Sequence, residues 1–209
     1  MDQNVQKIFQ GIVDGKQELV PEAVEAALQA GVPARTILDE GMLAAMAEVG
    51  RQFEEGECYV PEMLISARAM KAGLARLQPS LKQTDVKAVG RVAIGTVKGD
   101  LHDMGKNLVG MMLEGAGFTV KDLGVDVTPE VFVAAADEVD VIGLSALLTT
   151  TMGQMKNTLE ALEAAGKRPK VKVIVGGAPV TESFARNIGA DGYAPDASRA
   201  VALAKSLIG

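Results

Sequence analysis

The sequence has few of the residues from which proteins build disulfides, zinc sites and aromatic binding surfaces. Its 209 residues include one cysteine, one histidine, no tryptophan, two tyrosines and five phenylalanines. A single cysteine excludes an internal disulfide, and Cys58 has no second cysteine or neighbouring histidine with which to bind zinc. We therefore interpret Cys58 as a buried or half-buried structural thiol.

Long apolar runs and an excess of positive charge are also missing. Hydrophobic residues make up 48% of the chain, yet no run approaches the roughly 20 residues that a membrane span needs. The N-terminus shows neither a secretory nor a transit-peptide pattern. A formal net charge of −6 argues against nucleic acid as a partner. We expect a cytoplasmic protein that binds neither membrane nor nucleic acid.

The character of the sequence changes near residue 85. Before that point, apolar residues recur at helical spacing, and three prolines stand where first-turn prolines belong. The segments 33–55 and 61–81 each predict one long amphipathic helix. Four helices with short connections predict a small antiparallel bundle, which we assign to residues 1–84. The polar stretch 78–87 is expected to be a linker.

Residues 90–209 alternate short apolar runs with helical stretches, which is typical of a parallel, doubly wound sheet. We predict an α/β fold in which an N-terminal four-helix bundle cap is followed by a Rossmann-like or flavodoxin-like sheet of five parallel strands. The expected strands are 92–97, 119–123, 141–147, 171–175 and a weak fifth at 192–194.

Polar residues and glycines follow three of these expected strands. His102, the only histidine, lies after the first strand, with Asp100 two residues before it and Gly105 three residues after it. Ligands of open α/β sheets bind outside the carboxyl ends of the strands, so this is a candidate binding edge. The residues that end the third strand and lead into the next helical stretch are Ser145, Leu147, Thr149 and Thr151, and Gly176 and Gly177 end the fourth strand.

Taken singly, these residues have ordinary explanations. A loop histidine beside an aspartate is more often a surface or capping residue, and Gly-Gly after a strand is usually a tight turn. Together, the order Asp-x-His-x-x-Gly, Ser-x-Leu and Gly-Gly resembles the cobalamin-binding module of methionine synthase. Over its whole length the chain resembles the free-standing corrinoid proteins of methanogen and acetogen methyltransferase systems. The segments 96–107, 49–56 and 59–63 are especially similar.

The resemblance implies a cofactor, namely cobalamin or a related cobamide, carried as methylcobalamin with its cobalt. His102 would be the metal ligand, binding cobalt through Nε2 in place of the cofactor's own lower base. Asp100 would accept a hydrogen bond from the other ring nitrogen, which fixes the tautomer of such ligands. Thr151 stands where the methionine synthase module has a serine that completes this relay. His102, Asp100 and Thr151 are the candidate catalytic residues, and the resemblance implies methyl transfer coupled to proton uptake.

The same resemblance assigns further contacts to the cofactor. Gly105 would allow the backbone to approach it closely, and Gly176 and Gly177 would leave a slot for its nucleotide tail. Ser145 and Thr149 would form hydrogen bonds to the tail or the corrin edge. The cofactor-binding set also includes Asp103 and Leu147.

Side chains of the helical region complete the predicted site. The resemblance places Phe53, Val60 and Met63 over the methyl-bearing face of the cofactor, as an apolar lid that opens for transfer. Periodicity alone favours ordinary bundle-core residues at these positions. Lys98, Lys106 and Asn107 either contact the corrin amides or phosphate or are solvated.

The function that the resemblance implies is methyl transport in the one-carbon metabolism of an anaerobe. The chain would be the carrier subunit of a cobalamin-dependent methyltransferase system, whether or not it counts as an enzyme itself. Its partners would be a substrate-specific methyltransferase, a second methyltransferase acting on tetrahydrofolate or a thiol coenzyme, and a reductive activase. The main alternative is a cobalamin-binding sensor, although such proteins carry a tryptophan and a DNA-binding region that this sequence lacks. A carbon-skeleton mutase subunit or a flavodoxin-like domain would be further alternatives.

Overall fold

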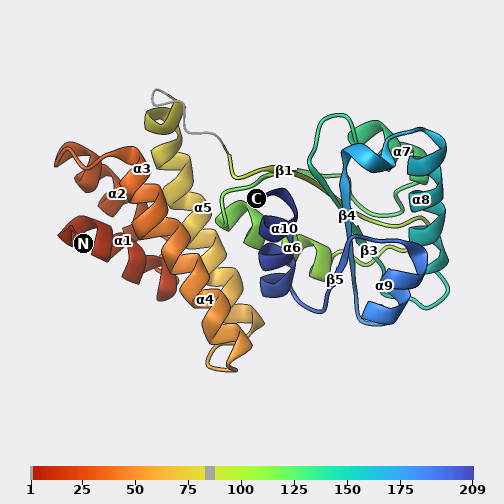
Figure 1. Cartoon of the computed structure of the whole chain (residues 1–209). Helices are drawn as coiled ribbons and strands as arrows, with labels where there is room; N and C mark the ends of the chain where they lie inside the picture. The colour runs from red at the N-terminus through yellow and green to blue at the C-terminus, as the bar shows by residue number, and fades with distance from the viewer. Residues whose placement is uncertain (1, 83–87) are drawn as a thin grey trace. The chain divides into compact units, whose positions relative to one another are not determined.

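The computed structural model describes residues 2–82 and 88–209, which form two compact units, one helical and one containing a sheet (Figure 1). The predicted domain boundary between residues 84 and 90 falls mostly on residues 83–87, outside the described residues, and stays a prediction. Within the described residues, no helix combines the length and the apolar character that crossing a membrane requires.

The helical unit consists of antiparallel helices with short connections (Figure 1). Residues that recur every three or four positions are buried, for example Val5, Ile8 and Ile12, because each helix turns one apolar stripe to its neighbours. A Cβ atom at Gly73 would lie 2.6 Å from the side chain of Val20, so glycine lets α2 and α5 pack closely. The elements are α1 (Gln3–Val13), α2 (Leu19–Gln29), α3 (Ala34–Thr36), η1 (Ile37–Leu43), α4 (Ala44–Glu54) and α5 (Val60–Lys82).

Two details of this unit differ from the sequence prediction. The long helix expected over 33–55 is continuous, but its segment η1 is a π-helix. The linker expected over 78–87 is wrong at its start, because α5 continues through Pro79 to Lys82. Leu77 and Leu81 are buried on this last stretch, and their burial favours the helix although Pro79 cannot donate a backbone hydrogen bond.

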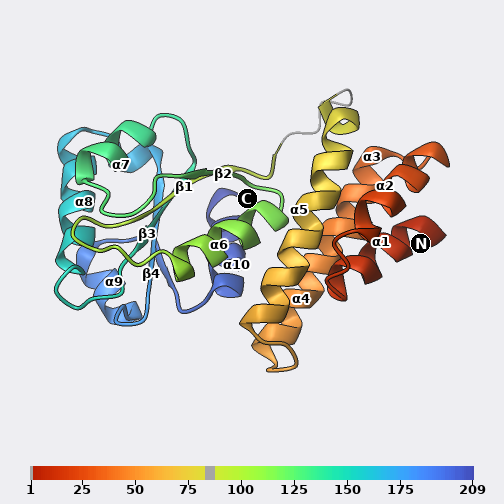
Figure 2. The same ribbon diagram turned by 180° about the vertical axis from the view of Figure 1, so that it is seen from behind.

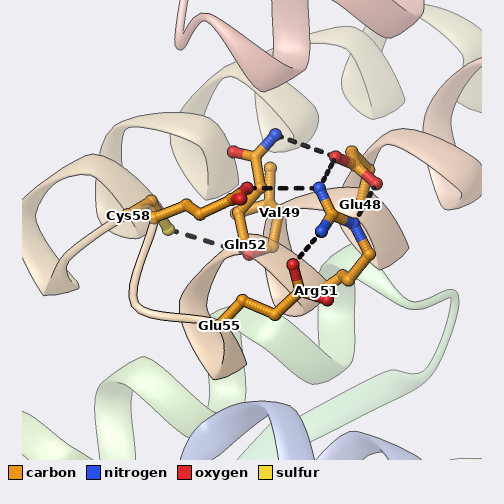
Figure 3. Close-up of polar contacts among 7 residues, drawn as sticks. Glu48, Val49, Arg51, Gln52, Glu55 and Cys58 are labelled. Carbon is orange, nitrogen blue, oxygen red and sulfur yellow. Dashed lines mark hydrogen bonds and ion pairs between the residues drawn. The ribbon is translucent and has the colours of Figure 1, made fainter.

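The connection between α4 and α5 is tied to α4 by its backbone and by a thiol. The amides of Glu57 and Cys58 both donate to the carbonyl of Gln52, and Gly56 has a φ of 74° that favours glycine. The buried thiol of Cys58 donates to the carbonyl of Val49, with 3.7 Å between Sγ and the oxygen (Figure 3). Burial, followed by the charge of Glu62, raises the pKa of the Cys58 thiol.

The second unit contains five parallel strands in the order β2-β1-β3-β4-β5, with helices on both faces (Figure 2). The predicted fold class is therefore confirmed. Helices α6 and α10 cover one face and α7, α8 and α9 the other (Figures 1 and 2). The strands are β1 (Arg91–Thr96), β2 (Thr119–Asp122), β3 (Val141–Ser145), β4 (Lys172–Gly176) and β5 (Gly192–Ala194). The helices are α6 (Met104–Gly115), α7 (Pro129–Ala135), α8 (Gly153–Ala164), a 3-10 turn η2 (Arg168–Lys170), α9 (Glu182–Ile188) and α10 (Ala197–Ile208).

The strand order locates the candidate binding edge. The connection that leaves β1 leads to β2 on one side, and the connection that leaves β3 leads to β4 on the other side. In sheets of this order a ligand crevice opens at that switch point between β1 and β3. Thr96, Ser145 and Gly176 end the three central strands and are paired in register, so the loops that follow emerge side by side. The third strand ends at Ser145 rather than at the predicted residue 147.

Candidate functional site

The loop after β1 begins with a tight turn. The amide of Asp100 donates to the carbonyl of Val97 at 3.1 Å, and Gly99 has a φ of 81°. A glycine with positive φ at the third position is characteristic of a type II turn. The hydroxyl of Thr96 then donates to the carbonyl of His102 at 2.8 Å. The backbone around the histidine is therefore held from both sides.

His102 and Asp100 form the centre of the site. The Nδ1 atom of His102 lies 2.7 Å from Oδ1 of Asp100, and the His102 amide donates to the same oxygen at 3.1 Å. The side chain of Asp100 is fully buried, whereas that of His102 is 51% exposed. One nitrogen of the imidazole is thus fixed by the protein, while the ring itself is accessible.

The second carboxylate oxygen of Asp100 is held by the loop after β3. The amides of Leu147 and Leu148 donate to Oδ2 at 2.8 and 3.2 Å. The hydroxyl of Thr151 lies 2.8 Å from the same oxygen, and also 2.9 Å from the carbonyl of Leu148. These amides turn towards Asp100 instead of pairing with β4, which explains why the strand ends at Ser145.

The hydrogen bonds keep Asp100 charged. Burial raises its pKa, but the hydrogen bonds from the Leu147 amide, His102 and Thr151 outweigh burial and hold that pKa well below its usual range. A carboxylate can only accept, so it is the Nδ1 atom of His102 that carries a proton. The lone pair of the neutral ring is then on Nε2, which is the atom able to bind a metal ion.

Apolar side chains are unusually exposed around this imidazole. Met104 is 84% exposed and Leu101 72%, and Leu147 and Leu148 are also exposed. A Cβ atom placed on Gly105 would meet nothing within 4 Å. An accessible imidazole surrounded by exposed apolar groups and an open glycine fits a large, flat, mostly apolar group that carries its own metal ion.

Several other predicted residues lie along the same edge. Asp103 accepts from the side chain of Asn107 at 3.0 Å, at the start of α6. Ser145 contributes its carbonyl to the amide of Val97, and Thr149 is exposed. Within the part of the chain that the structure describes, the hydroxyls of Ser145 and Thr149 have no hydrogen-bond partner, so their contacts with a cofactor stay predictions.

The glycine pair after β4 has a steric role that the sequence did not indicate. A Cβ atom on Gly177 would lie 1.9 Å from the carbonyl oxygen of Ala146, and one on Gly176 would lie 2.9 Å from that of Ala194. Gly177 also has a φ of 125°. Contact between neighbouring backbones therefore already requires glycine here, and a slot for a nucleotide tail stays a prediction.

The three predicted lid residues differ in exposure. Val60 is 42% exposed, Phe53 is half-buried and Met63 is fully buried. Val60 and Phe53 flank the connection between α4 and α5, so their side chains are available to a ligand. The role of all three residues as a cover stays a prediction.

Lys106 differs from its sequence interpretation. Its side chain is only 2% exposed, and its Nζ atom donates to both carboxylate oxygens of Asp122 at 2.6 and 2.7 Å. It is therefore not a solvated charge, and its ammonium group joins α6 to the end of β2. The sequence also did not single out Thr96, the amides of Leu147 and Leu148, or Asp126, which accepts from the Gly99 amide at 2.6 Å.

Comparison with known families gives two matches. A family described as "B12 binding domain" matches residues 90–202, and a second with the same description matches residues 5–78.

The chain is also similar to individual proteins over nearly its full length. It is 45% identical over 207 residues to dimethylamine corrinoid protein 2 of Methanosarcina acetivorans, covering 98% of this chain and 95% of the relative. It is 41% identical to a trimethylamine corrinoid protein of the same organism, covering 98% and 96%.

Among solved structures, the methanol:cobalamin methyltransferase complex MtaBC of Methanosarcina barkeri contains a chain of similar fold, with a TM-score of 0.88 and 30% identity. The match covers 99% of this chain and 80% of that one. A cobalamin-binding protein of Desulfitobacterium hafniense matches with a TM-score of 0.82 and 30% identity over 98% of both chains.

Proposed function

From the premise that this chain belongs to the B12-binding family of corrinoid proteins, we propose that His102 supplies the protein's ligand to the cobalt of its cofactor. The observation that supports this most directly is the buried, charged Asp100 behind an accessible imidazole. The protein binds cobalamin or a related cobamide and is a methyl-carrying corrinoid protein that works with methyltransferases.

A bound corrinoid supplies a cobalt ion that takes up and releases a methyl group. The contribution of the chain would be the imidazole of His102, which would bind that ion. Asp100 fixes the proton of His102 on Nδ1 and leaves the lone pair of Nε2 facing outwards. Carboxylate–histidine pairs of this kind orient metal ligands and raise their basicity. With or without a bound metal ion, Asp100 would hold the Nδ1 side of the ring and so keep Nε2 in the same orientation.

The remaining residues hold the cofactor and exclude water. Leu101, Met104 and Leu147 offer the exposed apolar surface against which a corrin ring packs. Gly105 leaves room for its edge, since no atom lies within 4 Å of the Cβ position. In the same proposal, the exposed Val60 and the half-buried Phe53 would help to keep water from the methyl group, whereas Met63, predicted as the third lid residue, is fully buried and offers no free surface for this.

The names of the relatives support a methyltransferase as a partner. The similar chain in the complex from Methanosarcina barkeri is part of a methanol:cobalamin methyltransferase, and other relatives are named for dimethylamine or trimethylamine. We propose that a substrate-specific methyltransferase loads this carrier, that a second methyltransferase unloads it, and that a reductive activase restores it. Small methylated amines are the class of donor that the relatives support best. The cytoplasmic location expected from the sequence stays a prediction.

Anaerobic reconstitution with a cobamide tests the role of His102. We expect the wild-type protein to give the ultraviolet–visible spectrum of a cofactor whose own lower base is displaced by histidine. The variant His102→Ala should bind the cofactor with the spectrum of a base-free form. Lys156→Ala, an exposed substitution in the same unit, serves as the control. An unchanged spectrum in His102→Ala would show that another group binds the metal.

A further inference from the structure

Asp126 has an unusual backbone conformation close to the candidate site. Its φ is 53°, and within residues 2–82 and 88–209 it is the one residue other than glycine with a positive φ. The left-handed region is unfavourable for residues other than glycine, and aspartate and asparagine tolerate it best. Conformations of this kind persist where the surrounding contacts impose them.

Two hydrogen bonds join Asp126 to the turn that precedes His102. Its carboxylate accepts from the amide of Gly99, with 2.6 Å between Oδ1 and the nitrogen. Its own amide donates to the carbonyl of Asp100 at 3.0 Å. One residue therefore binds the backbone of the turn at two successive positions, and the left-handed φ is what brings both groups to the same side.

The segment that carries Asp126 is anchored at both ends. At its start, Asp122 accepts from the amide of Gly124 at 2.8 Å and is itself bound by the buried ammonium of Lys106. At its end, the amide of Val127 donates to the carbonyl of Thr96 at 2.9 Å. The position of Asp126 is thus set by the sheet and by α6, independently of the histidine loop.

These contacts bear directly on the imidazole. The carbonyl that accepts from Asp126 belongs to Asp100, whose carboxylate orients His102. The backbone of Asp100 is otherwise held by its amide, which closes the turn onto Val97. Without the two hydrogen bonds from Asp126, Gly99 would be the least restrained point of the loop, since glycine has the widest choice of backbone conformations.

We propose that Asp126 is a positioning residue that fixes the turn before His102 and thereby sets the orientation of its imidazole towards the cobalt. The inference rests on the proposed role of His102 as the axial ligand. It requires the carboxamide or carboxylate acceptor of residue 126, and it does not require the negative charge.

Three substitutions separate positioning from simple loop stability. Asp126→Asn keeps both the acceptor and the tolerance for positive φ. Asp126→Gly removes the acceptor but relieves the backbone strain, whereas Asp126→Ala removes the acceptor and keeps the strain. The control is Asp137→Ala, which removes an exposed carboxylate that pairs with Lys167 elsewhere in the unit.

The first measurement needs no cofactor. Because the chain has a single histidine, nitrogen-15 NMR of the imidazole reports on His102 alone. We expect one tautomer, protonated on Nδ1, in the wild type, in Asp126→Asn and in the control. Asp126→Gly and Asp126→Ala should show a mixture of tautomers.

The second measurement is the ratio of histidine-bound to histidine-free cobalt after anaerobic reconstitution, read from the absorption spectrum. The ratio should fall about tenfold in Asp126→Gly and in Asp126→Ala, the loss expected for one hydrogen bond. In Asp126→Asn it should stay close to the wild-type ratio.

The pattern across variants decides the inference. A positioning role predicts that the ratio of histidine-bound to histidine-free cobalt falls equally in Asp126→Gly and Asp126→Ala, although the unfolding temperatures of the two variants differ. A loss that follows the unfolding temperature, or a wild-type ratio and tautomer in Asp126→Gly, would overturn it. If the wild-type protein itself shows no histidine-bound cobalt, the proposed function fails first, which distinguishes the two failures.

Discussion

The two units each contain a cluster of hydrogen-bonded carboxylates, and the two clusters differ in what surrounds them. In the helical unit, Arg51 of α4 is surrounded by Glu48, Glu55 and Glu57 (Figure 3). In the sheet unit, Asp100 is surrounded by the His102 imidazole, the Thr151 hydroxyl and three backbone amides. Both environments lower the pKa of a carboxyl group.

The cluster around Arg51 is exposed and consists of full charges. Arg51 donates to both carboxylate oxygens of Glu48, at 2.8 and 2.6 Å, and also to Glu55. The hydrogen bonds from Arg51, followed by that from Gln52, lower the pKa of Glu48 to about 2, and the glutamates raise the pKa of Arg51. All of these groups remain in contact with water, which competes for them and screens their charges.

The cluster around Asp100 is buried and relies mostly on neutral donors. Its amide donors belong to the backbone of the loops after β1 and β3, so no side-chain conformational entropy is lost when they donate. A low pKa is therefore common to both clusters, and the buried one holds the proposed cobalt ligand in one orientation. The clusters differ in the burial of the acceptor rather than in the direction of its pKa shift.

The two clusters should differ most in the free energy of unfolding that is lost when the central side chain of each is removed. Asp100→Ala leaves the amides of Leu147 and Leu148 without their acceptor in a buried place, and we expect a loss of about 3 kcal/mol in the free energy of unfolding. Urea denaturation measures it, with Asp137→Ala as the exposed control. Equal midpoints in both variants would mean that the buried cluster does not stabilise the fold.

Lowering the pH should weaken the hydrogen bonds of the Asp100 carboxylate by protonating it, without any substitution. The pKa of Asp100 is lower in the folded protein than in the unfolded chain, so the unfolded chain binds more protons in the interval between the two values. The contribution of Asp100 to stability is complete above about pH 4, the ordinary pKa of aspartate, and is lost as the pH falls through the folded value.

Urea titrations of the wild type and Asp100→Asn at descending pH values check this sign. The stability advantage of the wild type should shrink as the pH falls below the ordinary aspartate pKa. An advantage that grows in acid would contradict the assignment of a charged Asp100.

A smaller effect is expected at the hydroxyl of Thr151. Thr151→Val keeps the shape but removes the donor to Asp100, which should cost about 1–2 kcal/mol in unfolding free energy. Thr151→Ser keeps the hydroxyl and should cost less than the valine variant. If serine costs as much as valine, the methyl group rather than the hydrogen bond is what stabilises this position.

The smallest effect is expected in the exposed cluster. Arg51→Ala should leave the unfolding temperature within experimental error, because exposed ion pairs contribute little to stability. In about 1 M salt, where charges are screened within ~3 Å, wild type and variant should become indistinguishable. A clear loss of stability in Arg51→Ala at high salt would remove the contrast between the two clusters.

The sequence predicted the parts of this molecule that depend on side-chain pattern. The strands follow from apolar runs such as 92–97, and the closeness of the loops after β1, β3 and β4 follows from parallel strands ending at one edge. Asp100, His102 and Thr151 could be picked out because their spacing matched a known pattern, and the structure brings the three together.

The features that the sequence did not predict depend on backbone groups, which are the same in every residue and so leave no pattern in the sequence. Nothing in the side chains of Leu147 and Leu148 indicates that their amides turn towards Asp100. The positive φ of Asp126 and the π-helical stretch η1 are likewise set by tertiary contacts rather than by local preference. The burial of Lys106 depends on Asp122, which lies beside it in the fold and pairs with its ammonium group.

The buried thiol between α4 and α5 has a practical consequence. A thiol reagent can reach Cys58 only when its contact with the carbonyl of Val49 opens, and its raised pKa keeps the unopened form inert. Since Cys58 is the only cysteine, the rate of labelling counts openings of the helical unit and nothing else. The chain thus carries one natural reporter in each unit, a sulfur in the helical unit and an imidazole in the sheet unit, with which the two units can be followed separately.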